Sequence, residues 1–108
     1  MKRIAFKMKL KTGCAEEYKH RHATIWPEIV RLLKKQGVED YSIFLDEETN
    51  TLFACQKVEE EDSDSQTFSS KEEKEIIYKW WAYMADIMET NEDNSPISIY
   101  LEEMFHLD

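Results

Sequence analysis

The sequence contains few of the residues that interrupt secondary structure, with two glycines and two prolines among 108 residues. This scarcity predicts long elements joined by few tight turns. The sequence also lacks any apolar run close to the roughly 18 residues that a membrane-spanning helix requires. Its opening segment, MKRIAFKMKLK, is too charged to form the core of a signal peptide. We therefore expect a cytoplasmic protein.

Positive charge is also scarce, because 14 lysines and arginines face 23 aspartates and glutamates, which gives a net charge of −9. Nucleic acid and anionic membrane surfaces are poor partners for such a chain, since both require a basic surface. Cys14 and Cys55 are far apart and form no Cys-x-x-Cys motif. They are expected to be free thiols in a reducing compartment.

The length and an apolar content of 42% fit a single domain spanning residues 1–108. Apolar residues alternate with mostly charged ones from residue 4 to residue 11, which predicts a strand with one wet face. A turn follows at residues 12–13. Apolar spacings of three and four then predict a helix from Cys14 to about Gln36, which ends before Gly37. Pro27 should bend or restart this helix, with Thr24 as the new cap.

Two short apolar runs, DYSIFL and TLFACQKV, are joined by DEETN and predict a hairpin. The acidic segment from about Glu61 to Lys74 favours a loop or a frayed helix start, with Ser69 or Ser70 capping the next helix. That helix carries an apolar stripe made of Ile77, Trp80, Trp81, Met84 and either Ile87 or Met88. NEDNSP is expected to be a loop and ISIYLEEMF a final strand.

The resulting order, β-α-β-β-α-β, predicts an α+β fold of the ferredoxin-like, split βαβ kind. In this arrangement both helices cover one face of an antiparallel sheet. The second face would expose a large apolar patch unless something covered it. A second copy of the chain is the simplest cover, so we expect a homodimer.

The segment EEYKHRHATIWPEI concentrates titratable and aromatic residues on the first helix. Tyr18 and His22 are four residues apart and share one face, which Trp26 extends by a turn. His20 points to nearly the opposite side and is expected at the surface. The two histidines cannot easily bind one metal from a regular helix, and no third ligand is evident, so no metal site is predicted.

The residues alone leave the role of these side chains open. His22 can be a general acid, because imidazole titrates near neutral pH, or a satisfied core residue. Tyr18 can equally be a residue at the edge of the core. Trp80 and Trp81 point about 100° apart, so at least one can line a pocket. Flat aromatic faces suit the C–H faces of a sugar.

Taken together, EEYKHRHATIWPEI, YSIFLD, the paired tryptophans and DNSP resemble the L-rhamnose mutarotase family from Ile4 to the C-terminal EEMFHL. The resemblance implies a dimeric domain of the dimeric α/β barrel type that interconverts the α and β anomers of L-rhamnose without metal or organic cofactor. It implies that His22 is the proton donor. It further implies sugar-contacting roles for four residues: Tyr18, Tyr41, Trp80 and Trp81.

Two alternatives remain beside this interpretation. One is a cofactor-free monooxygenase on the same dimeric architecture, and the other is a non-catalytic binding module whose aromatic stripe is only core. The acidic segment from about Glu61 to Lys74 departs from the family pattern, because it is a few residues longer than usual. This departure concerns the rim of a pocket and none of the motif residues.

Overall fold

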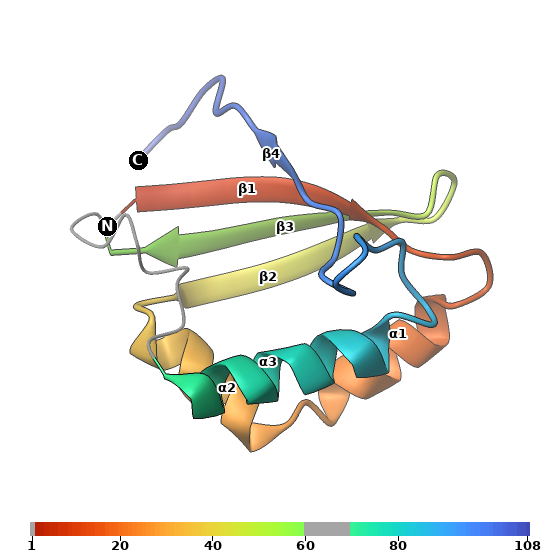
Figure 1. Cartoon of the computed structure of the whole chain (residues 1–108). Helices are drawn as coiled ribbons and strands as arrows, with labels where there is room; N and C mark the ends of the chain where they lie inside the picture. Colours follow the sequence, from red (N-terminus) through yellow and green to blue (C-terminus); the bar gives the residue numbers. More distant parts are fainter. Residues whose placement is uncertain (1, 60–69) are drawn as a thin grey trace.

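The fold is that of a computed structural model, which describes residues 2–59 and 70–108 (Figure 1). These residues form four strands and three helices. The elements in chain order are β1 (Lys2–Lys9), α1 (Ala15–Ala23), α2 (Pro27–Lys35), β2 (Glu39–Asp46), β3 (Thr51–Val58), α3 (Lys71–Met84) and β4 (Ile99–Leu101). The first predicted helix is therefore split into α1 and α2.

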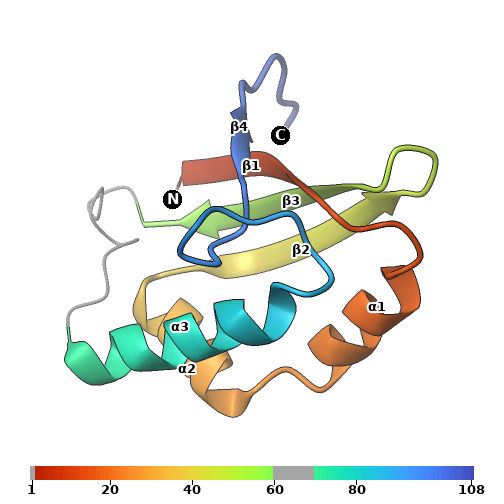
Figure 2. The same cartoon turned by 45° about the vertical axis from the view of Figure 1, so that its right-hand side comes forward.

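The strands form one sheet in the order β2-β3-β1-β4, with every neighbouring pair antiparallel. Figures 1 and 2 show all three helices below this sheet and the C-terminal chain above it. The predicted α+β, ferredoxin-like arrangement is confirmed. The space between the sheet and the helices holds the hydrophobic core and, as described below, the candidate site.

The helix-facing side of the sheet is built by alternate residues of β1 and β3. Phe6 and Met8 of β1 are buried, as are Leu52 and Ala54 of β3. This alternation follows from the two-residue period of a strand, which sends successive side chains to opposite faces. Met84 of α3 and Ile29 of α2 close the same core from the helical side.

The connection between α1 and α2 shows how the chain restarts at Pro27. Pro27 is the first residue of α2, where its missing N–H leaves no hydrogen bond unmade. The prediction that Thr24 caps the new helix is wrong. The Thr24 backbone N–H and its hydroxyl both donate to the His20 carbonyl oxygen, each at 3.1 Å. Thr24 therefore ends α1, because its hydroxyl is already committed to the preceding turn.

The helix α3 begins as predicted, because the Ser70 hydroxyl accepts a hydrogen bond of 3.1 Å from the Glu73 backbone N–H. It ends at Met84, however, so Ile87 and Met88 lie beyond the helix. Both are buried, and Met88 forms an isolated bridge with Leu10. Most of the segment interpreted as a loop or a frayed helix start lies outside the described residues.

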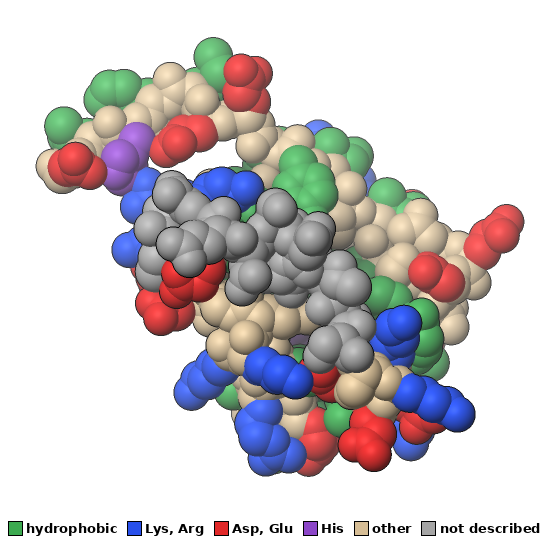
Figure 3. Space-filling view, turned by 60° about the vertical axis from the view of Figure 1, so that its left-hand side comes forward, with side chains coloured by type: hydrophobic (Ala, Val, Ile, Leu, Met, Phe, Trp, Pro, Cys, Tyr) green, Lys and Arg blue, Asp and Glu red, His purple; other side chains and the backbone are tan. Residues whose placement is uncertain are grey.

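The last strand is shorter than the predicted ISIYLEEMF. β4 pairs with β1 only through Ile99, Tyr100 and Leu101, and the chain then leaves the sheet. Figure 3 shows this C-terminal segment projecting from the body, with hydrophobic and acidic side chains along it. Its apolar side chains find little cover within one copy: Met104, Phe105 and Leu107 are each about 80% exposed.

Candidate active site

A cavity of about 1210 Å³ lies between the sheet and the helices. All five residues predicted to form the site line this cavity: Tyr18, His22, Tyr41, Trp80 and Trp81. They come from three elements, α1, β2 and α3, which are far apart in sequence. The volume is sufficient for a monosaccharide together with ordered water, given that small-molecule sites usually measure about 300–1,000 Å³.

Tyr18 and His22 meet on one face of α1, as their spacing predicts. Their rings stack with centroids 4.2 Å apart and an interplanar angle of 28°. His22 Nδ1 lies 3.1 Å from the Tyr18 carbonyl oxygen. A carbonyl oxygen can only accept a hydrogen bond, so Nδ1 carries the proton of the neutral ring. This leaves Nε2 as the nitrogen that is free for proton exchange.

The half-buried position of His22 changes its acidity. Burial lowers the pKa of the imidazole below its ordinary value, and the hydrogen bond to the Tyr18 carbonyl opposes this change. The neutral ring is therefore favoured more than in water. When the ring does take up a proton, the imidazolium is a stronger acid than an exposed one.

The two tryptophans of α3 occupy different environments. Trp80 is buried, and its indole packs edge-on against His22, with centroids 5.7 Å apart. It also packs edge-on against Trp26 at 5.1 Å. Trp81 is only partly buried and contacts the Tyr78 ring at 5.6 Å. Trp80 is thus both core and cavity wall, while Trp81 lines the cavity from a more open position.

The hydroxyls of Tyr18 and Tyr41 are held neutral by their surroundings. Burial, followed by the proximity of Tyr100, raises the pKa of Tyr41 to about 12. Burial, followed by the proximity of Tyr41, raises the pKa of Tyr18 as well. Neutral phenols can donate and accept hydrogen bonds, but they are poor bases. These two residues are suited to positioning a ligand rather than to removing its proton.

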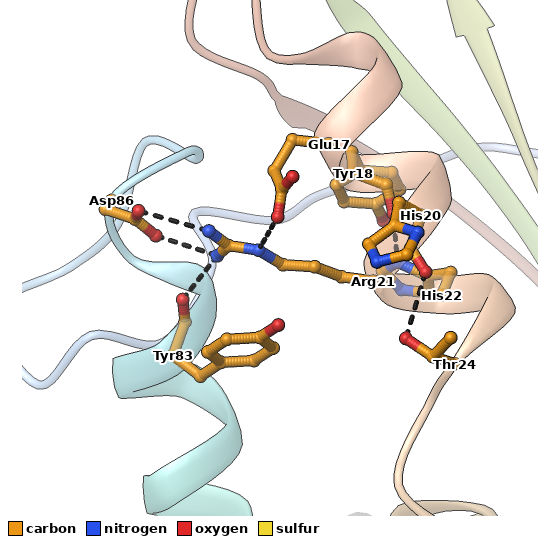
Figure 4. A network of polar contacts seen from close by, with 8 residues as sticks. All are labelled: Glu17, Tyr18, His20, Arg21, His22, Thr24, Tyr83 and Asp86. Atoms are coloured by element: carbon orange, nitrogen blue, oxygen red, sulfur yellow. Dashed lines mark hydrogen bonds and ion pairs between the residues drawn. The ribbon is translucent and has the colours of Figure 1, made fainter.

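Arg21 forms a clamp between α1 and the end of α3 that the sequence analysis did not identify (Figure 4). Its guanidinium donates to Asp86 Oδ1 at 2.8 Å and Oδ2 at 3.2 Å, and to the Tyr83 carbonyl oxygen at 2.6 Å. Its Nε donates to Glu17 Oε2 at 2.7 Å. The guanidinium also lies 4.4 Å from the centroid of the Tyr83 ring. The clamp fixes the helix that carries His22 against the helix that carries Trp80.

The charges in this clamp stabilise one another. The hydrogen bond from Arg21 lowers the pKa of Asp86, and the bonds to Asp86 and Glu17 raise that of Arg21. The positive guanidinium also lies at the C-terminal end of α3, where it complements the helix dipole. The four-residue spacing of Glu17 and Arg21 within α1 is typical of an ion pair on a helix. The contact between Arg21 and Asp86 has no such local signal in the sequence.

His20 is exposed on α1, away from the cavity, as expected. Cys14 and Cys55 are both free cysteines. Within residues 2–59 and 70–108, no group of three or more His, Cys, Asp and Glu side chains is arranged to hold a metal ion. In the same two ranges, no helix is long and apolar enough to cross a bilayer.

Comparisons with known proteins agree on one family. A family model described as L-rhamnose mutarotase matches residues 3–107. The L-rhamnose mutarotase of Bacteroides thetaiotaomicron is 60% identical over 108 residues, and that of Phocaeicola vulgatus is 56% identical, with 100% of each chain covered in both cases. The crystal structure of L-rhamnose mutarotase FA22100 from Formosa agariphila matches with a TM-score of 0.87 and 53% identity, covering 100% of both chains.

Proposed function

Because the chain belongs to the L-rhamnose mutarotase family, we propose that it interconverts the α and β anomers of L-rhamnose. The structural observation that carries this proposal is the His22 imidazole in the cavity wall, oriented by the Tyr18 carbonyl and flanked by Trp80. The family match does not favour a monooxygenase or a non-catalytic module, which the residues alone left open.

The proposed reaction opens and recloses the pyranose ring. His22 Nε2 gives a proton to the ring oxygen as the bond between that oxygen and the anomeric carbon breaks. The anomeric hydroxyl loses its proton to water, and its oxygen becomes the carbonyl oxygen of the open aldehyde. Rotation about the C1–C2 bond followed by the reverse proton transfers closes the other anomer. The steps are proton transfers together with the breaking and re-forming of one C–O bond, and His22 and water carry them out, so the proposal includes neither a metal nor an organic cofactor.

The remaining site residues bind and orient the sugar in this proposal. Tyr18 and Tyr41 form hydrogen bonds to sugar hydroxyls, since burial keeps both phenols neutral. Trp80 and Trp81 provide apolar surface for the C–H faces of the ring and exclude bulk water. The sugar is uncharged, so a net charge of −9 does not oppose its binding.

The test of the proton donor is His22→Gln, with His20→Gln as the matched control on the same helix. General acid–base catalysis typically contributes about 10²–10⁴-fold, so His22→Gln should lower kcat by about 100-fold or more. The control should keep the parent rate, because His20 is exposed and outside the cavity. Saturation-transfer NMR on the two rhamnose anomers measures the exchange directly. Equal exchange rates for parent and His22→Gln would refute the assignment.

The pH dependence tests the direction of proton transfer. A donor acts in its protonated form, so kcat/KM should fall as pH rises through the pKa of His22, which burial places below its ordinary value. A profile that falls toward acidic pH instead would make His22 a base that accepts the anomeric proton.

We also propose that the chain is a homodimer in the cytoplasm. The support for the dimer is the sheet face opposite the helices, where Phe44 is 66% exposed and Phe53 40%. Ile99 and Leu101 of β4 add to the same face, and the apolar C-terminal segment continues from it. A second copy would cover this surface. The proposed cytoplasmic location rests on the two free cysteines, because thiols stay reduced in that compartment.

A further inference from the structure

The pairing of β2 with β3 is irregular beside the cavity, at a point where Tyr41 of β2 and Gln56 of β3 both line it. Ser42 pairs with Cys55 and Glu39 pairs with Lys57, so Asp40 and Tyr41 together lie opposite the single residue Gln56. Asp40 has a φ of 49°, a left-handed conformation that few non-glycine residues adopt. This is a β-bulge, a feature that redirects side chains and is frequent next to active sites.

Gln56 lies on the helix-facing side of β3, together with Leu52, Ala54 and Val58, and is 6% exposed. It lines the cavity that also contains Tyr18 and His22. Its side-chain oxygen, Oε1, is buried and has no hydrogen-bond partner among the described residues. A buried acceptor without a partner destabilises a fold, so its presence in a ligand-sized cavity calls for a donor from elsewhere.

A second unpaired group lines the same cavity. Gln36, which follows α2, has a buried Nε2 that also lacks a partner among the described residues. Two residues that line the cavity therefore each have a buried polar atom without a partner among the described residues, one an acceptor and the other a donor. A polyhydroxylated sugar suits such a lining, because each hydroxyl can both donate and accept a hydrogen bond.

We propose that Gln56 is a specificity-determining residue whose Oε1 accepts a hydrogen bond from one ring hydroxyl of the sugar. The inference rests on the proposed mutarotase function and extends it to a residue outside the family motif. A site with a buried polar group strongly rejects an analogue that lacks the matching hydroxyl, because the protein group then stays unpaired. The bulge places Asp40 and Tyr41 opposite Gln56, and both Tyr41 and Gln56 line the cavity, so in this proposal the two residues contact the same sugar.

The test replaces the amide with apolar side chains of similar length, Gln56→Met and Gln56→Leu. We expect the KM for L-rhamnose to rise by about tenfold or more, while Tm is unchanged or higher because an unpaired buried acceptor has been removed. Anomer exchange followed by NMR gives KM and kcat, and thermal unfolding without sugar gives Tm. If Tm falls and KM does not change, or if neither variant folds, the amide is structural and the proposal is overturned.

Deoxy sugars identify the hydroxyl and separate the possible failures. L-Rhamnose analogues lacking the 2-, 3- or 4-hydroxyl are compared on the parent and on Gln56→Met. For the analogue that lacks the hydroxyl bound by Gln56, the parent and Gln56→Met should have the same KM. If the KM of Gln56→Met stays higher than that of the parent for every analogue, Oε1 does not bind a ring hydroxyl. If the parent itself does not accelerate rhamnose exchange, the proposed function fails instead.

Discussion

Apolar side chains on the two faces of the sheet differ in how much of them is exposed. Leu52 and Phe53 are neighbours on β3, yet Leu52 is 2% exposed and Phe53 is 40% exposed. The helices cover the face of Leu52, whereas no helix within residues 2–59 and 70–108 covers the face of Phe53 (Figure 1). A polar outer face is usual for an antiparallel sheet with one solvated side, so the exposed Phe44 and Phe53 side chains are the observation on which the proposed dimer rests.

Leu52→Ala should produce the largest loss of stability, because it leaves a cavity in the covered core. A change of this kind typically lowers the free energy of unfolding by about 2–5 kcal/mol. Urea denaturation measures it, and the loss should persist at every protein concentration because the core belongs to one copy. A loss that vanished at high concentration would mean that Leu52 contributes to the interface instead.

The matching change on the open face is the double variant Phe44→Ser/Phe53→Ser. We expect the dissociation constant of the dimer to rise at least tenfold, which corresponds to about 1.4 kcal/mol. Sedimentation velocity over a dilution series measures the monomer fraction. Tyr78→Ser is the control, because Tyr78 is also exposed but lies on α3, on the helical side of the sheet. A parent that is monomeric at all concentrations would refute the dimer.

The comparison of the two faces also shows what the sequence could predict. The period-two alternation of β1, the four-residue spacing of Tyr18 and His22, and the Ser70 cap are local signals, and each appears in the structure. Local signals also predicted a break at Pro27. They did not reveal that the Thr24 hydroxyl would bond backward to His20, because the same hydroxyl can cap either helix.

Long-range features were not readable from the sequence. Arg21 and Asp86 are 65 residues apart, and their contact depends on the packing of α1 against the end of α3. The bulge opposite Gln56 depends on strand register and on a left-handed aspartate, a conformation that no glycine marks in this segment. The predicted length of β4 was wrong, because β4 contains only Ile99–Leu101. The apolar residues of ISIYLEEMF indicate a buried or paired segment, but they do not indicate which residues that segment contacts.

The smallest expected effect is a pH-dependent loss of stability that comes from the covered side of the sheet. His22 has a folded-state pKa below its ordinary value of 6.5, with burial as the first cause. As pH falls below about 6.5, the unfolded chain takes up a proton at this position before the folded chain does, so the free energy of unfolding decreases. His22→Gln should remove this contribution and give a flatter dependence on pH.

Urea denaturation of parent and His22→Gln at pH 7.5, 6.5 and 5.5 measures the difference in slope. The control is Phe105→Gln, because Phe105 lies in the exposed C-terminal segment beyond the uncovered face and carries no titratable group. If burial beneath the sheet causes the effect, only His22→Gln changes the slope. If parent and His22→Gln lose stability in parallel, the imidazole is as well solvated in the folded chain as in the unfolded one. Burial beneath the sheet would then have no effect on the proton affinity of His22.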